Sequence, residues 1–407
     1  MKVENKIPNG WEESTLDNLT VINPRESISK GTLAKNIPMD CIDSFTRKIS
    51  RFGIKEFKGG TKFKNKDILL ARITPCLENG KTALVDFLDK DEIGFGSTEY
   101  IVIREKRDKS NYKFLYYLSI SPKFRQIAIK AMTGTSGRQR VQTDLLINKV
   151  FRFPPLQEQK AIAKVLTAFD DKIELLQDQN KTLETIAQTI FIEWFGKYKI
   201  GDELPEGWKI EKLGDVLNTY LGGTPSKSKN EYWDNGSIPW INSGEVNKFR
   251  ITEGTKFITK LGLDKSSTKL LPKGTVVIAI TGATLGQYSI LEIESCFNQS
   301  VIGIVGNNKI KRSFVYFWIA NNINLIVRNA TGGAQQHINK ENVNSSQMII
   351  PSNELIDKFQ SIVEPLMDKI SNNEFEIQSL SKIRDTLLPK LMSGQVRVNN
   401  LKQTIDA

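Results

Sequence analysis

The sequence contains one histidine, His337, and three cysteines, Cys41, Cys76 and Cys296, among its 407 residues. The cysteines are far apart and form no CxxC pair, so neither a disulfide framework nor a structural zinc site is expected. A Ser–His–Asp or Cys–His catalytic arrangement would have to use His337, which lies in a segment rich in Asn and Gln. The composition therefore argues against these classes of hydrolase and predicts no metal site.

Long apolar runs are missing as well. The sequence has no stretch of about 18 apolar residues that could span a membrane. Residues 1–5 (MKVEN) do not resemble the apolar core of a secretory leader. We therefore expect a cytoplasmic protein without a membrane partner.

The motifs of nucleotide-binding and methyl-transferring enzymes are also missing. A Walker A loop would end in Gly-Lys-Ser/Thr, and an adenine methyltransferase would show a short Asn/Asp-Pro-Pro-aromatic motif. The segment Phe153-Pro154-Pro155 begins with the wrong residue, and the acidic residues form no compelling nuclease cluster. The chain itself is predicted to be non-catalytic and to hold no cofactor.

Positive charge is in excess. Lys and Arg number 57 against 46 Asp and Glu, which gives a net charge of +11 and a pI of about 9.3. Such an excess favours a polyanionic partner, most often nucleic acid. The apolar content of 39% is enough for ordinary globular cores.

The second half of the chain repeats the first at an offset of 197 residues. The Pro-x-Gly-Trp segment at 8–11 recurs at 205–208, and Asp-Lys-Ile at 171–173 recurs at 368–370. Many matches at one offset predict two copies of one unit, each a globular domain of mixed structure followed by a long helix. Single residues that match at this offset include Gln139 and Gln336, Leu183 and Leu380, Ile186 and Ile383, and Thr189 and Thr386.

Two segments, 156–195 and 353–392, have apolar residues at the seven-residue spacing of a coiled-coil seam. Each seam needs a partner, and covalent repeats commonly mimic a twofold dimer, so we predict that the two helices pair antiparallel. The alternative is that each amphipathic helix lies on the core of its own domain. The predicted seam residues are Ile162, Leu166, Phe169, Ile173, Leu176, Leu183 and Ile190 in the first helix, and Phe359, Val363, Leu366, Ile370, Ile377, Leu380 and Leu387 in the second.

Polar residues and prolines interrupt these seams. Asn180 is the polar member of the first seam, and Asn373 and Arg384 are the polar members of the second. Pro365 is expected to kink the second helix and Pro389 to bend or end it, because proline lacks an N–H group and clashes with the preceding turn.

The helices do not share the positive charge. Residues 157–199 carry a net charge of −1 and residues 353–392 a net charge of −2, so removing this −3 from +11 leaves +14 on the rest of the chain. The basic surface is therefore expected on the globular domains. The helices are expected to act as spacers and docking surfaces.

The domains are expected at 1–153 and 200–350, with the helices in 154–199 and, together with the C-terminal tail, in 351–407. Short β-rich runs are punctuated by Gly, Asn and Pro, and helical patterns follow them. Regular β–α alternation is absent, which indicates the α+β class and not a doubly wound parallel sheet. The β-rich runs are 67–73, 99–103, 275–280 and 300–305, and the helical patterns are 111–131 and 311–328.

Three loop regions are expected to contact DNA. The Gly-rich stretch 222–230 offers small hydroxyl residues and lysines that suit phosphate oxygens, although a solvated flexible loop is the alternative. The equivalent stretches 133–140 and 331–337 offer Arg and Gln, which pair with guanine and adenine edges. The stretches 72–81 and 281–288 occupy matching places with different chemistry, so the two copies are expected to recognise different half-sites. The candidate DNA-binding residues are Arg72, Thr74, Lys81, Arg138, Gln139, Arg140, Thr224, Ser226, Lys227, Lys229, Thr281, Tyr288, Gln335, Gln336 and His337.

Together these motifs resemble those of the specificity (S) subunits of bacterial type I restriction–modification enzymes. The resemblance covers the whole chain and departs from the family pattern at 351–354, which lacks the Gln-Glu-Gln form, and at Pro365. It rests on the two Pro-x-Gly-Trp segments, the Gly223-Thr224-Pro225-Ser226 loop with Tyr232-Trp233 and Ile238-Pro239-Trp240, the stretch 73–81 (ITPCLENGK), the segment 154–159 (PPLQEQ) and the closing segment 387–394 (LLPKLMSG).

The resemblance implies an α+β chain of two pseudo-repeated target-recognition domains separated by two long antiparallel coiled-coil helices. Each domain would bind one half of a split double-stranded DNA target. The helices would set the gap between the halves and dock two methyltransferase (M) subunits. Restriction (R) subunits would complete the complex, and S-adenosylmethionine, ATP and Mg²⁺ would serve these partner subunits.

Two other functions remain to be compared with this one. The first is a stand-alone restriction or methyltransferase polypeptide, which the missing enzyme motifs argue against. The second is a coiled-coil scaffold that binds only proteins, which salt-dependent binding to DNA would distinguish from a specificity subunit.

Overall fold

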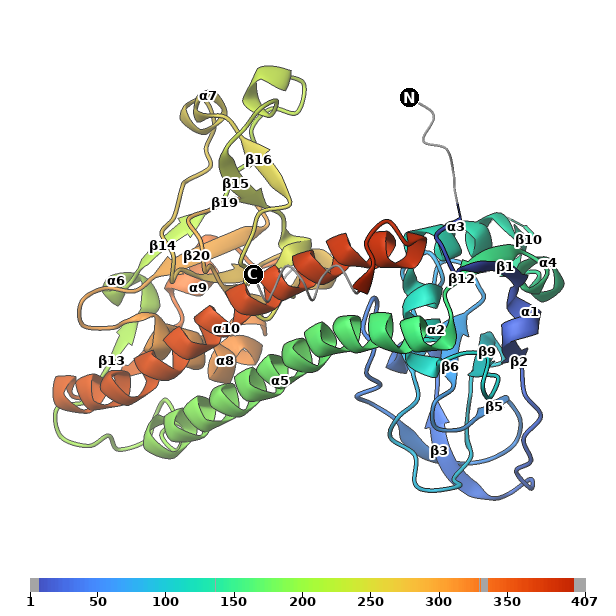
Figure 1. The fold of residues 1–407 in the computed structure, drawn as a ribbon. Coiled ribbons are helices and arrows are strands. Elements are labelled where there is room, and N and C mark those ends of the chain that lie inside the picture. Colours follow the sequence, from blue (N-terminus) through green and yellow to red (C-terminus); the bar gives the residue numbers. More distant parts are fainter. Residues whose placement is uncertain (1–6, 136, 329, 331–335, 399–407) are drawn as a thin grey trace, which may run out of the picture. The chain divides into compact units, whose positions relative to one another are not determined.

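The computed structural model describes residues 7–135, 137–328, 330 and 336–398, and the chain divides into two compact units. Unit 1 combines Met1–Ile173 with Leu380–Ala407, and unit 2 is Glu174–Ser379. The two long helices α5 (Leu156–Phe195) and α10 (Asn353–Ser393) each begin in one unit and end in the other (Figure 1).

Unit 1 contains a four-stranded antiparallel sheet in the order β2-β9-β6-β7 and a second four-stranded sheet in the order β4-β3-β8-β5, in which β3 and β8 are parallel. Two short pairs, β1-β12 and β10-β11, complete its strands. The strands are β1 (Glu12–Thr15), β2 (Thr20–Ile22), β3 (Leu33–Ile37), β4 (Gly53–Glu56), β5 (Thr61–Phe63), β6 (Ile68–Ala71), β7 (Thr82–Leu84), β8 (Gly94–Gly96), β9 (Tyr100–Glu105), β10 (Met132–Thr133), β11 (Arg140–Val141) and β12 (Val150–Phe153). The shorter helices are α1 (Leu16–Leu19), η1 (Met39–Cys41), α2 (Tyr112–Ile120), α3 (Pro122–Lys130) and α4 (Thr143–Ile147).

Unit 2 repeats this topology. Its main sheet has the order β14-β20-β17-β18, its second sheet the order β16-β15-β19 with β15 and β19 parallel, and β13 pairs with β21 as β1 does with β12. The strands are β13 (Lys209–Lys212), β14 (Asn218–Leu221), β15 (Ile238–Ile241), β16 (Lys256–Ile258), β17 (Val276–Ala279), β18 (Tyr288–Ile290), β19 (Cys296–Phe297), β20 (Val301–Val305) and β21 (Gln347–Ile350). The shorter helices are α6 (Leu213–Val216), η2 (Asn230–Tyr232), η3 (Ser243–Glu245), α7 (Lys260–Asp264), η4 (Gly282–Thr284), α8 (Arg312–Val327) and α9 (Lys340–Asn344). The predicted duplication and α+β class are confirmed.

The four predicted β-rich runs form the two central antiparallel pairs, β6 with β9 and β17 with β20. All four residues of β6 are buried, and its side chains alternate between two apolar clusters. Ile68 and Leu70 face α2, whereas Leu69 faces the second sheet of the unit. β17 divides its side chains in the same way, with Val276 on the helical side. These runs are continuously apolar because both faces of each sheet are covered.

The Pro-x-Gly-Trp segments form the same turn in both units. The Trp11 amide donates to the Pro8 carbonyl at 3.0 Å, and the Trp208 amide donates to the Pro205 carbonyl at 3.1 Å. The intervening glycine has φ +80° in unit 1 and +79° in unit 2. This left-handed conformation disfavours residues with a Cβ atom, which explains why glycine is kept at this place in both copies.

The first helical pattern, predicted over 111–131, is broken into α2 and α3, whereas its counterpart α8 is continuous. Pro122 disfavours helical backbone at Ser121, which has ψ 144°. The Ser121 hydroxyl instead accepts from the Phe124 amide and caps α3. Unit 2 has no proline within 312–327, so its helix continues.

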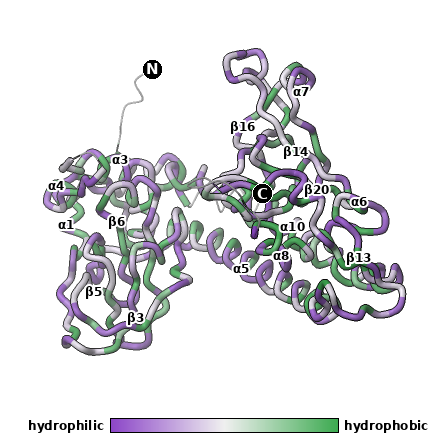
Figure 2. Tube along the Cα trace, turned by 180° about the vertical axis from the view of Figure 1, so that it is seen from behind, coloured by the Kyte–Doolittle hydropathy of each residue, from purple (hydrophilic) through white to green (hydrophobic). Residues whose placement is uncertain are grey.

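The two long helices pair antiparallel within each unit, as predicted. In unit 2, Asn180 of α5 contacts Asn373 of α10, and Phe191 further along α5 packs against Phe359 earlier in α10. In unit 1, Arg384 of α10 forms an ion pair with Asp170 of α5. Each of the fourteen predicted seam residues is buried or half-buried, and hydrophilic and hydrophobic residues alternate along α5 (Figure 2).

The helices also pack on the domains, so the alternative prediction, that each helix lies on the core of its own domain, describes part of the packing. Ile162 and Leu166 belong to the same apolar cluster as α2 and the main sheet of unit 1, together with Leu391 of α10. The prolines of α10 do not end it, because the helix continues through Pro365 and Pro389 to Ser393. The expectation that Pro389 would end the helix is not met, and Gly394 with φ +72° follows Ser393.

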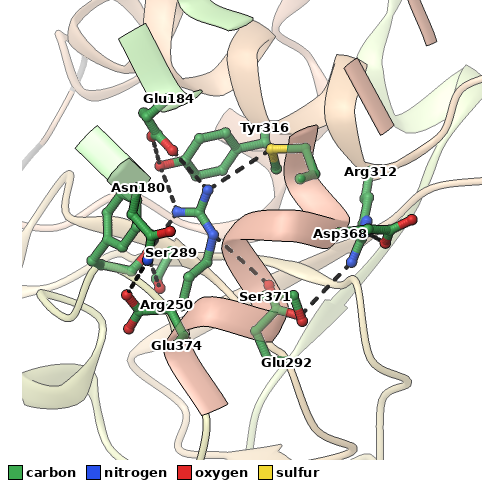
Figure 3. Close-up of polar contacts among 12 residues, drawn as sticks. Asn180, Glu184, Arg250, Ser289, Glu292, Arg312, Tyr316, Asp368, Ser371 and Glu374 are labelled. Atoms are coloured by element: carbon green, nitrogen blue, oxygen red, sulfur yellow. Dashed lines mark hydrogen bonds and ion pairs between the residues drawn. The ribbon is translucent and has the colours of Figure 1, made fainter. Parts of the chain in front are cut away.

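A buried ionic cluster holds the domain of unit 2 on both helices (Figure 3). The fully buried Arg250 side chain donates to Glu184 of α5 at 2.7 Å and to the Tyr316 hydroxyl at 3.2 Å. The Tyr316 hydroxyl in turn donates to Glu184 at 2.6 Å. Nearby, Ser371 of α10 donates to the buried Glu292 at 2.7 Å. The position of the unit 2 domain on the helices therefore depends on the buried charges of Arg250 and Glu292 and on Glu184, whose side chain is 23% exposed.

Candidate nucleic-acid interface

Two of the predicted loops lie together in unit 1. The Thr74 amide and hydroxyl both donate to the Gln139 carbonyl, at 3.0 and 3.1 Å, and the Gln139 amide lies 3.0 Å from the Thr74 hydroxyl. An isolated bridge joins Ile73 to Arg140. Stretches 72–81 and 133–140, about 60 residues apart in the sequence, thus form one surface cluster that we call loop cluster 1.

An acidic residue organises the arginines of loop cluster 1. Arg140 donates to both carboxylate oxygens of Glu99 at 2.7–3.0 Å, and Arg72 lies 3.7 Å from the same carboxylate. The hydrogen bond from Arg140 lowers the pKa of Glu99 below its usual value. The Arg72 amide also donates to the Glu99 carbonyl. Glu99 therefore fixes the orientation of the Arg140 guanidinium and forms a longer ion pair with Arg72.

The remaining candidates of unit 1 differ in their accessibility. Arg138 is exposed, and its guanidinium has no partner among the residues that the structure describes. Lys81, in contrast, donates its ammonium to the Met39 carbonyl at 2.8 Å and is half-buried. Arg138 is therefore available to a ligand, whereas Lys81 secures the loop internally.

The same two loops meet in unit 2. Thr281 forms an isolated bridge with His337, and the Gly282 amide donates to the Gln336 carbonyl at 2.9 Å. Gln336 and His337 are exposed, and Gln335 lies outside the described residues. We call this arrangement loop cluster 2. Its position in the unit matches that of loop cluster 1, while its side chains are different.

The Gly-rich stretch 222–230 borders a separate hollow in unit 2. Thr224 donates to Gln299 at 2.6 Å, and Lys229 donates to the Tyr232 hydroxyl at 3.2 Å, a contact that raises the lysine pKa. Ser226 is exposed, lies 2.9 Å from the Ser228 hydroxyl, and accepts from Trp233 through its carbonyl. A cavity of about 520 Å³ is lined by exposed Lys227 and Phe257 and by Trp233, among others. A lysine beside aromatic faces suits a phosphate next to a stacked base.

Tyr288 does not join either loop cluster. It lies on β18, where its ring packs edge-on against Tyr316 at 5.6 Å, and burial raises its pKa. The structure therefore places Tyr288 beside the Arg250 cluster, in a packing position. The sequence offered no means to separate it from the loop that precedes it.

Two polar residues that contact the predicted loops were not predicted. Glu99 lies just before strand β9 and contacts loop cluster 1, whereas Gln299 lies just before strand β20 and contacts Thr224 of the Gly-rich stretch. The available signal was their position, because a polar residue directly before a buried strand lies at the edge of its sheet. Neither residue type alone predicts contact with a basic loop.

No group of three or more His, Cys, Asp or Glu side chains among the residues that the structure describes could hold a metal ion. None of the helices in this part of the chain is both long enough and apolar enough to cross a membrane.

Comparison with known proteins identifies the duplicated unit. A family model described as type I restriction modification DNA specificity domain matches residues 8–185 and matches again at 205–385. The chain belongs to this family. Each match to the specificity domain begins at a Pro-x-Gly-Trp turn and ends within a long helix, so the resemblance seen in the motifs is confirmed.

Relatives of the chain are named specificity subunits of type I restriction enzymes. The MjaIX specificity subunit of Methanocaldococcus jannaschii is 29% identical over 304 residues, which cover 71% of this chain and 70% of that protein. The HindI specificity subunit of Haemophilus influenzae is 26% identical over an alignment of length 421, which covers 84% of this chain and 90% of that protein. The solved S subunit of M. genitalium has the same fold, with a TM-score of 0.60, 20% identity and coverage of 96% and 98% of the two chains.

Proposed function

We propose that this chain is the DNA-binding specificity subunit of a type I restriction–modification complex. The observation that carries the proposal is the pair of loop clusters, which occupy equivalent places in two copies of the specificity domain but present different side chains. One fold with two different recognition surfaces fits a bipartite, asymmetric DNA target. Each domain recognises one half of that target.

Catalysis belongs to partner subunits in this proposal. Methyltransferase subunits using S-adenosylmethionine would modify the DNA, and restriction subunits using ATP and Mg²⁺ would cleave it, while this chain supplies recognition in the cytoplasm. Support comes from the names of the relatives, which are specificity subunits of type I restriction enzymes.

The test of DNA recognition is duplex binding at several salt concentrations, with the chain alone and with its M subunits. Because phosphate contacts release counterions, the logarithm of the binding constant is expected to fall linearly with the logarithm of the salt concentration. A scaffold that binds only proteins would show no such binding. Methylation or cleavage of DNA by the purified chain alone would instead support the stand-alone enzyme.

Each unit has one exposed isoleucine at a corresponding position of its long helix, where two copies of one partner could dock. Ile186 of α5 and Ile383 of α10 occupy equivalent repeat positions, and they are 44% and 47% exposed. Exposed positions without a shared role diverge freely, as Leu175 and its counterpart Asn372 have done. The retained isoleucines therefore support docking of two M subunits, one on each unit.

Replacing either isoleucine with aspartate is expected to remove one M subunit, because a buried, unpaired carboxylate disfavours an apolar contact. I186D and I383D should each bind one M subunit, and the double variant none, as counted by native mass spectrometry. L175D is the matched control, since Leu175 is 62% exposed on α5. Two M subunits on the double variant would exclude this surface.

A further inference from the structure

The polar residues that interrupt the two seams are partners of one another in unit 2. The Asn373 amide group donates to the side-chain oxygens of Asn180, at 2.7 Å, and Gln179, at 2.8 Å. The Asn180 amide group donates to Glu374 at 2.7 Å. We call these four residues the Asn layer. Asn180 and Asn373 are 2% and 0% exposed, so neither can replace these partners with water.

Unit 1 contains a second polar layer between the same helices. Arg384, the third interruption of the seams, donates to Asp170 of α5 at 2.6 Å. The Tyr117 hydroxyl of α2 donates to the other oxygen of Asp170, also at 2.6 Å. The Asp170 side chain is 5% exposed. The Asp170 carboxylate is therefore buried and tied to the domain through Tyr117, while the Arg384 side chain is 15% exposed.

Apolar seams alone do not determine the alignment of two helices. If α10 slid by seven residues along α5, apolar rows would still face apolar rows over most of their length. The polar residues would not tolerate this change. Asn180 would face Leu366 or Leu380 instead of Asn373. A buried amide without a partner is strongly unfavourable, and a buried unpaired charge is worse.

The same displacement would separate the second layer. Arg384 would move by two turns, toward Ile162 or Leu176, and Asp170 would lose its cation. Asn180, Asn373, Asp170 and Arg384 have their observed partners in one register and in neither of the adjacent ones, while the Asn373 Oδ1 atom has no hydrogen-bond partner among the described residues. A single buried Asn at a seam position is known to specify register in coiled coils, and this helix pair has an amide layer in one unit and a charged layer in the other.

We infer that the Asn layer and the Asp170–Arg384 pair fix the register of α5 against α10, together with the contacts that each helix makes with the domain of its unit, and that this register determines which spacer length between the half-sites is accepted. The second part rests on the proposed function. A slip of one heptad moves a helix by about 10 Å at 1.5 Å per residue, which corresponds to about three base pairs at 3.4 Å per base pair. These polar residues are thus specificity-determining although they lie away from both loop clusters.

The first test measures register without DNA. In the full chain, spin labels on unnatural amino acids at the exposed positions Gln177 and Asp357 of unit 2 are separated by roughly 28 Å along the helix axis at 1.5 Å per residue. The wild-type chain is expected to give one narrow distance. The double variant N180L/N373L replaces both amides with apolar side chains of comparable size, so it should fold. Its distribution of label distances should be broadened by about 10 Å. N372L, an exposed Asn→Leu change beside the layer, should match the wild type.

The second test measures spacer selectivity in the complex with M subunits. A duplex library carrying the two half-sites at varied spacing is expected to yield one spacer with the wild type and N372L. N180L/N373L should also retain spacers about three base pairs longer or shorter, enriched at least 10-fold over the control, with unchanged half-sites. D170N/R384L keeps an acceptor for the Tyr117 hydroxyl and should likewise widen the range of spacers that is retained. This variant replaces N180L/N373L in the test if the latter does not fold.

The outcomes separate the two proposals. A folded layer variant that keeps one label distance and one spacer overturns the register inference. If the wild type selects no bipartite target, the proposed function fails, and the label distances still decide whether the layers fix the register.

Discussion

Replacement of Arg250 by methionine is expected to destabilise unit 2 by about 3–5 kcal/mol, the range for breaking a buried ion pair by removing one partner. The Arg250 side chain is fully buried and neutralises Glu184, while Glu292 lies 3.8 Å from its Nε. Methionine fills a similar volume but removes the positive charge that Arg250 places beside Glu184 and Glu292. Hydrogen exchange of peptides from unit 2, measured by mass spectrometry, reports the loss within that unit.

A control and a partial rescue distinguish charge burial from simple loss of an arginine. Arg51 pairs with Asp43 at 2.9 Å, but its side chain is 59% exposed, so R51M should change stability by no more than about 1 kcal/mol. Adding E184Q to R250M should recover part of the loss, because the unpaired charge is removed. Comparable losses from R51M and R250M, or no recovery in the double variant, would contradict this account.

The duplication and both long helices could be predicted from the sequence, because periodicity and a constant offset are properties of the chain itself. The seam interruptions Asn180, Asn373 and Arg384 were also visible as departures from that periodicity. Their partners were not, since pairing Asn180 with Asn373 requires the antiparallel register, which neither helix contains alone. The pairing of Asp170 with Arg384 could not be predicted either, because aspartate is usually exposed and only the fold buries this one beside Arg384.

The loops were predictable as candidates but not as a surface. Residue type identified Thr74 and Gln139 separately. Only the tertiary fold brings them together, through the bridge between Ile73 and Arg140 and the backbone hydrogen bond from Val141 to Arg72. Residue type also could not tell Arg138, which is exposed and has no side-chain partner in the part of the chain that the structure describes, from Lys81, which donates to the Met39 carbonyl. The direction of a long basic side chain depends on which carbonyl groups the fold places within its reach.

Arg138 is accordingly the candidate for which substitution is expected to have the largest effect on recognition. R138A should reduce discrimination at one half-site by about 1–3 kcal/mol, the range for a bidentate contact to a base, which is roughly 5- to 150-fold at 1.4 kcal/mol per tenfold. The other half-site should be unaffected, because loop cluster 2 belongs to a separate domain copy. Competition binding with duplexes altered in one half-site at a time, at fixed salt, measures both.

Two further variants determine how this result is interpreted. R107A removes the same charge from unit 1 at a side chain that is 96% exposed outside the loop clusters, so it should lower affinity slightly for all sequences. Q336A in loop cluster 2 should produce the mirror-image effect, with loss at the opposite half-site only. If R138A weakened both half-sites equally, or if R107A reproduced its pattern, Arg138 would be supplying charge and not base recognition. Independent losses would instead assign one half-site to each domain, since two separate protein surfaces can lose discrimination separately only if each contacts its own part of the DNA.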